Sequence, residues 1–311
     1  MDFDSTATRG LATNIVGDIL PQSDTLLWLG TGSGLAVLRD TSSIFTLATS
    51  KNLSQGAVTN TPEGAVSALD VSGNALFAAF ATSGENITKG NGLIYSDNST
   101  GKTISWTYFD QLVDTEADSL TPFAKRFFRG LPVTVKEANV TYDAAINGSN
   151  IYITSWAGGL RRYNILTKIW QRIPLPQDGD HILNTCDESS YISTTSGSIL
   201  RDFYLNPRDP EDGGNHNHKA FSVISYADTV WVGTANGINR GLVGANGCIN
   251  WKHYTPLNNG LSGGFVVDLA LQQYKKHNII WAATVLAETG ESNGVSYSID
   301  GGDTWLSLIH I

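Results

Sequence analysis

The sequence is poor in methionine, cysteine and charge. Its 311 residues include one Met and two Cys, and 16% of them are charged, which is below the usual quarter. No apolar run approaches the roughly 18 residues of a membrane-spanning helix, so we expect no direct insertion into a membrane. A net charge of -9 would repel a phosphate backbone, which disfavours nucleic acid as a partner. The 32 glycines and 8 tryptophans that are present are typical of a β-rich protein with many tight turns.

The two ends of the sequence and its cysteines bear on location. The start, Met1-Asp2-Phe3-Asp4, has neither the basic nor the apolar region of a signal peptide, so the chain is either cytosolic or trimmed of a leader. We expect trimming, because Leu308-Ile309-His310-Ile311 stop within an apolar strand. On this interpretation we expect the chain to be a fragment of a larger secreted protein. Cys186 and Cys248 either form one disulfide or stay free, and neither lies in a metal-ligand spacing.

One short pattern occurs six times along the chain: an apolar strand, a small residue, a glycine turn and a second apolar strand. Its clearest copy is Val230-Trp231-Val232-Gly233-Thr234 followed by Asn236-Gly237-Ile238. The aromatic anchors of the copies are Trp28, Phe77, Tyr152, Tyr191, Trp231 and Trp281. The turn glycines that open the next strand are Gly34, Gly92, Gly159, Gly197, Gly237 and Gly294. The anchor spacing centres on the roughly 40–50 residues of a four-stranded propeller blade.

The anchor strands are apolar at consecutive positions, as in Leu26-Leu27-Trp28-Leu29, so they are covered on both faces. A blade meets this condition because it lies between two neighbouring blades. Upstream strands are expected at 14–20, 65–71, 140–146, 220–225 and 266–271, and downstream strands often carry a Trp. We therefore predict an all-β chain that forms a single β-propeller domain over 1–311. About six four-stranded blades are expected, with five or seven as alternatives, and insertions at about 110–132, holding a short helix, and 206–219.

Two known patterns support this architecture. Asn259-Gly260-Leu261, with Val266-Val267-Asp268, the Trp281 strand and Asn293-Gly294-Val295, resembles the propeller repeat of two-component regulators. Arg9-Gly10-Leu11 and the Trp28 unit are similar to the same repeat at the other end of the chain. The resemblance implies a sensor region or a secreted protein outside the cytoplasm. Such sensors usually carry about twice as many repeats, followed by a membrane helix and a kinase, which do not follow here.

The segment Ser298-Ile299-Asp300-Gly301-Gly302-Asp303-Thr304-Trp305 resembles the Asp-box of sialidases, xyloglucan-type glycoside hydrolases and sortilin-like receptors. In those families the motif is a structural hairpin remote from any active site. The resemblance implies that Ser298, Asp300, Gly302 and Trp305 are structural here. Asp300 would cap backbone N–H groups of the turn, and Trp305 would pack under the next blade.

Few residues suggest catalysis. Arg172-Ile173-Pro174 resembles the sialidase triplet that supplies a carboxylate-binding arginine, but it follows Trp170 and is expected to end an outer strand. Glycoside hydrolysis needs two carboxylates about 5–10 Å apart, and the 29 acids do not single out a pair. Two acidic clusters are expected to be solvated loop surface: Asp114, Glu116 and Asp118, and Asp209, Glu211 and Asp212.

His216 and His218 are the candidate metal ligands. Residues two apart on a strand share a face, so two imidazoles could meet one metal ion there. No third nitrogen or sulfur ligand is nearby in sequence, and a polar loop is the default interpretation. No cofactor site and no catalytic residue are assigned.

Three functions stay open. The first is a non-catalytic binding or scaffold propeller outside the cytoplasm, either secreted, periplasmic or at the cell surface. It is expected to be a monomer with a glycan or protein ligand at one end of the barrel. The second is a glycoside hydrolase, which would show two buried carboxylates with raised pKa facing each other at the channel mouth. The third is the sensory segment of a membrane-bound two-component regulator.

Overall fold

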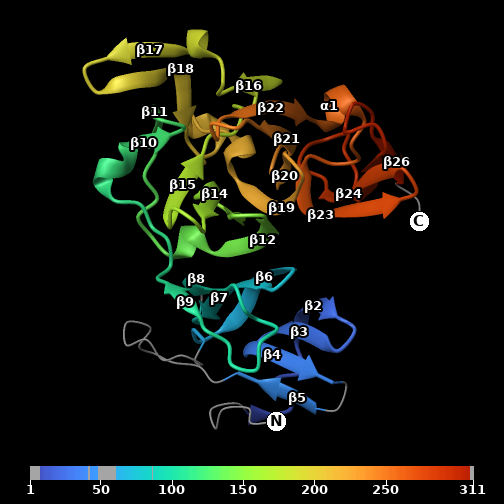
Figure 1. Ribbon diagram of the computed structural model, residues 1–311. Helices are drawn as coiled ribbons and strands as arrows, with labels where there is room; N and C mark the ends of the chain where they lie inside the picture. Colours follow the sequence, from blue (N-terminus) through green and yellow to red (C-terminus); the bar gives the residue numbers. More distant parts are fainter. Residues whose placement is uncertain (1–7, 41–42, 48–60, 86, 309–311) are drawn as a thin grey trace. The chain divides into compact units, whose positions relative to one another are not determined.

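The computed structural model describes residues 8–40, 43–47, 61–85 and 87–308 (Figure 1). The last three residues of the expected terminal strand, 309–311, lie outside this range. The chain divides into two compact units, one of residues 1–113 and 135–151 and the other of residues 114–134 and 152–311. In the described part of the chain, no helix has the length and apolar character needed to cross a membrane.

The first unit contains two antiparallel sheets. The first sheet has the order β1-β5-β4-β3-β2 and consists of β1 (Thr8–Arg9), β2 (Val16–Ser23), β3 (Leu26–Thr31), β4 (Gly34–Arg39) and β5 (Ser43–Thr46). The second runs in chain order through β6 (Ala65–Ser72), β7 (Ala75–Ser83), β8 (Thr88–Ser96) and β9 (Thr107–Phe109). The single-turn helix η3 (Glu137–Asn139) and strand β12 (Thr141–Asn147) also belong to this unit.

The anchor strands β3 and β7 of the first unit are buried at consecutive positions, as predicted, whereas in the second unit Tyr191 on its strand is only half-buried and the Trp281 strand alternates between buried and half-buried residues. Trp28 on β3 and Phe80 on β7 are fully buried in one apolar cluster that both sheets share. The Trp28 ring meets Trp106 edge to face, with centroids 6.3 Å apart, and its indole N–H donates to Gln22 Oε1 at 2.8 Å. The consecutive apolar residues of β3 therefore face partners on each side.

Three further sheets are antiparallel, and their strands follow one another in chain order except for the edge strand β16 (Figure 1). One is β12-β13-β14-β15, with β13 (Asn150–Ser155), β14 (Gly159–Asn164) and β15 (Ile169–Ile173), and the unit boundary after Ile151 falls within β13. The next, β16-β22-β21-β20-β19, comprises β16 (Ile182–Asn184), β19 (Ala220–Tyr226), β20 (Thr229–Thr234), β21 (Gly237–Val243) and β22 (Ile249–Tyr254). After α1 (Pro256–Asn259) come β23 (Phe265–Tyr274), β24 (His277–Val285), β25 (Gly294–Ser298) and β26 (Leu306–Leu308).

The remaining sheet differs from the sequence-based prediction. Its order is β10-β11-β18-β17, with β10 (Leu120–Phe123), β11 (Arg126–Gly130), β17 (Tyr191–Thr194) and β18 (Gly197–Leu205). β11 and β18 pair in parallel, so the Tyr191 unit is a hairpin completed by a distant hairpin and not a four-stranded meander. The segment 110–132 holds the expected short helix, η2 (Glu116–Ser119), together with the two strands that were not expected.

The chain is therefore all-β, and its described residues form six sheets of four or five strands. The predicted upstream strands are present as β2, β6, β12, β19 and β23. Trp170 and Trp251 lie on the outer strands β15 and β22, whereas Trp106 and Trp305 lie one residue before theirs. The remaining single-turn helices in the described residues are η4 (Glu188–Ser190), η5 (Pro210–Asp212) and η6 (His216–His218).

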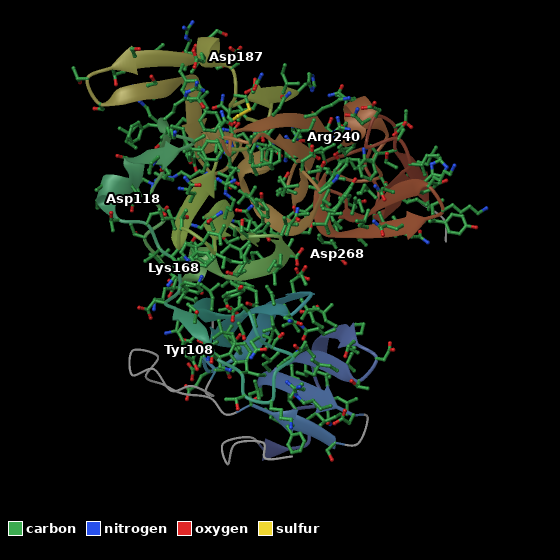
Figure 2. All side chains as sticks on the ribbon, viewed as in Figure 1. Tyr108, Asp118, Lys168, Asp187, Arg240 and Asp268 are labelled. Atoms are coloured by element: carbon green, nitrogen blue, oxygen red, sulfur yellow. A yellow bond between two sulfur atoms is a disulfide. The ribbon has the colours of Figure 1, made fainter. Side chains whose placement is uncertain are left out.

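Cys186 and Cys248 form a disulfide, visible as the yellow bond near Asp187 in Figure 2. It lies beside the edge strand β16, which reaches back to pair with β22. Thr185 reinforces the same edge, because its backbone N–H donates to the Ile249 carbonyl at 3.0 Å. The covalent link therefore fastens an early segment of the chain to a sheet built from later strands.

Candidate ligand-binding cleft

A cleft of about 610 Å³ opens at one end of the sheets of the second unit. Its walls come from the turns β13–β14, β20–β21 and β24–β25 and from the connections before β19 and after β22. Alternate turns of an antiparallel meander lie at the same end of a sheet, so these segments converge although they are far apart in sequence. The repeat itself therefore builds the site.

The β20–β21 turn shows how the repeat shapes this end. Thr234 Oγ1 donates to the Gly237 carbonyl at 3.0 Å and accepts from the Asn236 N–H at 3.1 Å. Gly237 has φ +96°, and a Cβ there would lie 2.1 Å from the Tyr254 carbonyl oxygen, so only glycine fits. The small residue at the end of the anchor strand is thus a hydroxyl that closes the turn.

The predicted turn glycines occupy three kinds of position. Gly34, Gly159, Gly197 and Gly237 each begin the strand after a short turn. Gly92 instead lies inside β8, beside a register shift, rather than at a hairpin turn. Gly294 begins β25 after the longer loop 286–293, which contributes to the cleft.

Trp156, in the β13–β14 turn, is the exposed aromatic residue of the cleft, with 40% of its surface accessible. Its ring meets Phe221 edge to face at 5.5 Å, and Phe221 packs on Phe265 at 4.3 Å. The Lys219 ammonium lies 5.0 Å from the centre of the indole ring. These contacts hold the indole in place while part of its surface stays open to a ligand.

Lys219 brings positive charge to a cleft wall that also carries acidic residues. Lys219 Nζ donates to Asp209 Oδ1, and His216 Nε2 lies 3.3 Å from the same oxygen. Hydrogen bonding and charge from Lys219, assisted by His216, lower the pKa of Asp209 below its ordinary value. Asp209 therefore stays ionised at neutral pH and is a poor general acid.

Asp178 and Glu291 fix the cleft's loops through backbone contacts. Asp178 accepts from the N–H groups of His216 at 2.9 Å and Asn217 at 2.7 Å. Glu291 Oε2 accepts from the N–H groups of Gly264 at 2.8 Å and Ala287 at 2.7 Å. The carboxylate of Glu288, on an exposed residue of the same loop, lines the cleft beside them.

The histidine pair does not have the geometry on which the metal prediction rested. His216 and His218 lie in η6, a single-turn helix, so they do not share a face as they would on a strand. His218 is fully buried, with Nδ1 3.0 Å from the Asn206 N–H donor and Nε2 3.1 Å from the Leu175 carbonyl. Burial lowers the pKa of His218 to about 4, so it is neutral. Within the described ranges, no group of three or more His, Cys, Asp or Glu is arranged to hold a metal ion.

The two acidic clusters have different environments. Asp209, Glu211 and Asp212 are exposed, as expected for a solvated loop. Asp114 is buried, contrary to the prediction, because Arg161 and Arg172 reach it at 2.6 and 3.1 Å. Burial alone would raise the pKa of Asp114, but the two guanidinium groups and the Val133 N–H lower it below its ordinary value. The sequence carried no sign of this, since the partners lie far along the chain.

Arg172 lies on the outer strand β15, as predicted, but its side chain is buried and does not line the cleft. Burial, with a contribution from Arg161, lowers its pKa to about 9, while Asp114 acts in the opposite direction. Arg172 therefore stays charged at neutral pH inside the protein. The carboxylate that Arg172 binds is that of Asp114, in the same chain.

The segment 298–305 forms the turn between β25 and β26. Asp300 accepts from the Thr304 N–H at 3.0 Å and from the Ser298 hydroxyl at 2.8 Å, and the Gly302 N–H donates to Ser298 Oγ at 2.8 Å. Trp305 is buried and packs against the sheet of β20 and β22, which precedes it in the chain. Arg240, labelled in Figure 2, also reaches this turn through the Gly301 carbonyl.

Buried carboxylates with raised pKa were the expected mark of a glycoside hydrolase. Burial raises the pKa of Asp70 to about 6, although the N–H groups of Ile146 and Val71 oppose the shift. Asp70 lies on β6 in the first unit and accepts from the Ile146 N–H at 2.5 Å, so it is not part of the cleft. Asp70 therefore does not belong to the pair of facing carboxylates that a glycoside hydrolase would show at this cleft.

No family model and no curated protein matches this chain. Among solved structures, similar ones include the extracellular domain assigned to a hybrid two component system of B. thetaiotaomicron, at 14% identity and TM-score 0.48, covering 97% of this chain and 28% of that one. An ancestral GH74 enzyme matches at 13% identity and TM-score 0.49, over 95% of this chain and 34% of its own. The Cps50 (Swd1) β-propeller domain of Myceliophteria thermophila matches at 14% identity and TM-score 0.48, over 95% of this chain and 67% of that one. This chain therefore spans about a third or less of the first two proteins.

Sequence reasoning missed Trp156 as a site residue. The repeat pattern did contain a signal, because Trp156 follows Ser155 where the Trp231 unit has Ala235 after Thr234. A large aromatic residue at a turn position that is small in another copy is not explained by packing within the repeat. Lys219 and Asp209 fall within the predicted insertion at 206–219, but their meeting across it was not predicted.

Proposed function

We propose that this chain is a β-propeller binding module that works outside the cytoplasm and receives a glycan in the cleft at Trp156. The propeller arrangement is supported by neighbouring sheets that contact each other through their first strands. β6 contacts β2 and β12 in the first unit, and β19 contacts β23 in the second. Neighbouring blades of a propeller pack on one another in the same way.

The observation that carries the proposal is the partly exposed indole of Trp156 among polar groups. A sugar ring presents an apolar C–H face and a rim of hydroxyl groups. The indole offers a flat apolar surface for the first, and the Glu288 carboxylate with the amides of Asn236 and Asn258 offers hydrogen-bond partners for the second. A cleft of about 610 Å³ lies within the usual range for ligand sites.

The Cys186–Cys248 disulfide supports a location outside the cytoplasm. Disulfides persist in oxidising compartments and are rare where glutathione keeps thiols reduced. The same location is expected of the secreted and sensor propellers that the repeat resembles. Glycans of the cell surface and the environment are met in that compartment.

The test is a glycan array probed with the oxidised chain, followed by titration calorimetry of the glycans that bind. Trp156→Ala is expected to weaken binding by about 30-fold, since removing a central aromatic contact typically costs about 2 kcal/mol. Tyr274→Ala is the matched control. Like Trp156, Tyr274 is an exposed aromatic residue (54%) with a lysine ammonium near its ring, at 5.1 Å, but it lies at the end of β23 away from the cleft.

Three outcomes would count against the proposal. If no glycan binds, or if both variants bind as the wild type does, the cleft is not a glycan site. If a peptide competes for the cleft and no glycan does, the ligand is a protein. Release of new reducing ends from a bound glycan would favour the glycoside hydrolase alternative instead.

A further inference from the structure

The Arg172 side chain ends beneath the turn that carries Trp156. Its Nε donates to the Gly158 carbonyl at 3.0 Å, and its Nη2 donates to the Ala157 carbonyl at 2.8 Å. These are two consecutive carbonyls, directly after Trp156. The planar guanidinium suits such a pair, because its donors point in fixed parallel directions.

The other side of the guanidinium is fixed as well. Arg172 Nη1 donates to Asp114 Oδ2 at 3.1 Å and to the Leu131 carbonyl at 2.8 Å. Asp114 is held in turn by the Val133 N–H at 2.8 Å and by Arg161 Nη2 at 2.6 Å. The turn is thus tied through one buried cation to both ends of the segment 114–133.

We propose that Arg172, held by Asp114, is a positioning residue for the cleft: it fixes the turn 156–158 so that the Trp156 indole is already oriented for a ligand. The expected effect on glycan affinity rests on the proposed function, but the orientation of the Trp156 indole is measurable without a ligand. A buried ion pair alone does not require a role beyond packing. The role is indicated here by where the donors go, because half of the contacts of Arg172 are to the turn.

Arg161 supplies a matched control. It lies opposite Arg172 in the β14–β15 ladder and donates to Oδ1 of Asp114, whereas Arg172 donates to Oδ2. Both of the turn carbonyls named above are bound by Arg172. Replacing either arginine by lysine keeps the charge and removes the planar fork, so only Arg172→Lys should release the turn.

The experiment uses the full chain labelled with 5-fluorotryptophan and observed by fluorine NMR. Trp156→Phe assigns the Trp156 signal, and the signal of buried Trp231 is the internal reference. Arg172→Lys is expected to shift or broaden the Trp156 signal and leave that of Trp231 in place, while Arg161→Lys perturbs the Trp156 signal less, because both turn carbonyls stay bound to Arg172. Glycan affinity should fall by about two- to tenfold in Arg172→Lys, the range for re-immobilising one side chain on binding.

An unchanged Trp156 signal in Arg172→Lys would overturn the inference, whether or not a glycan binds. Equal perturbation by Arg161→Lys would overturn it too, because the effect would then be general loss of packing. If Arg172→Lys does not fold, Asp114→Asn is used with the same readout, and a Trp156 signal identical to the wild type again refutes the inference. Failure of glycan binding with a perturbed Trp156 signal would refute the proposed function alone.

Discussion

Trp305 and Trp231 meet edge to face, with ring centroids 6.3 Å apart and planes inclined by 83°. Trp231 is the anchor of one sheet, and Trp305 comes from the turn 298–305 of the next sheet in the chain. Both belong to one apolar cluster that includes Tyr254 and Val266. The turn is therefore more than a connection between two strands, because it supplies a side chain that joins two sheets.

Trp305→Ala should lower the free energy of unfolding of the chain by about 3–5 kcal/mol, because it leaves a cavity between two sheets. Trp305→Phe should cost clearly less, since it keeps an aromatic ring at the contact. Denaturant titration followed by circular dichroism measures both. Equal losses for the two variants would show that the ring contact with Trp231 contributes little.

The Asp300 carboxylate gives the same turn a dependence on pH. Hydrogen bonds from Thr304 and Ser298 lower its pKa to about 2. A depressed pKa in the folded state stabilises the fold above the unfolded pKa, and this contribution is lost as the pH falls through the folded value. Asp300→Asn should therefore be less stable than the wild type at neutral pH, with a difference that shrinks between about pH 4 and pH 2.

The melting temperatures of Asp300→Asn and the wild type across this pH range check the prediction. The group is largely exposed, so the expected difference is small. A difference that is constant with pH would mean that the amide disturbs the turn by its geometry rather than by its charge.

Asp70 should show the opposite dependence. Burial raises its pKa to about 6, so the ionised form opposes folding, and stability present at low pH is lost as the pH rises through that value. Asp70→Asn keeps an oxygen that can accept from the Ile146 N–H. The variant should gain up to about 2–3 kcal/mol over the wild type at pH 8, and the gain should vanish near pH 4. Stability curves that run parallel from pH 4 to pH 8 would contradict this assignment of the titrating group.

Removing the disulfide should lower the free energy of unfolding without changing the strand order. The cysteines are 62 residues apart, and closing a loop of that length is worth about 4 kcal/mol in the chain-entropy model. The double variant Cys186→Ser with Cys248→Ser should lose about that free energy of unfolding. A reducing agent should lower the stability of the wild type to the same level and leave the double variant unaffected.

The sequence was most informative where burial is local. A run of consecutive apolar residues, such as the Trp231 strand, predicts without further information that both faces of the strand are covered. The turn glycines and hydroxyls indicate where strands end. The five upstream strands were found for the same reason. These features depend on residues that are close together in the sequence, so the sequence alone predicts them.

The sequence was least informative where a residue's partner is distant. The residues that surround Asp114 in the sequence are typical of a surface loop. Its burial depends on two arginines that lie 47 and 58 residues away in the chain. The parallel pairing of β11 with β18 likewise joins segments that share no pattern. His216 and His218 were read with strand geometry, which failed because the chain forms a single helical turn there.

Strands β16 and β19 lie at opposite edges of one sheet. The long chain segment between them includes the β17–β18 hairpin. Both ends of this segment are therefore anchored in the same sheet, and the Cys186–Cys248 disulfide fixes the end that follows β16. Foreign sequence grafted at the hairpin tip, Thr195-Ser196, should thus alter what the molecule displays while the sheet below keeps its strand order.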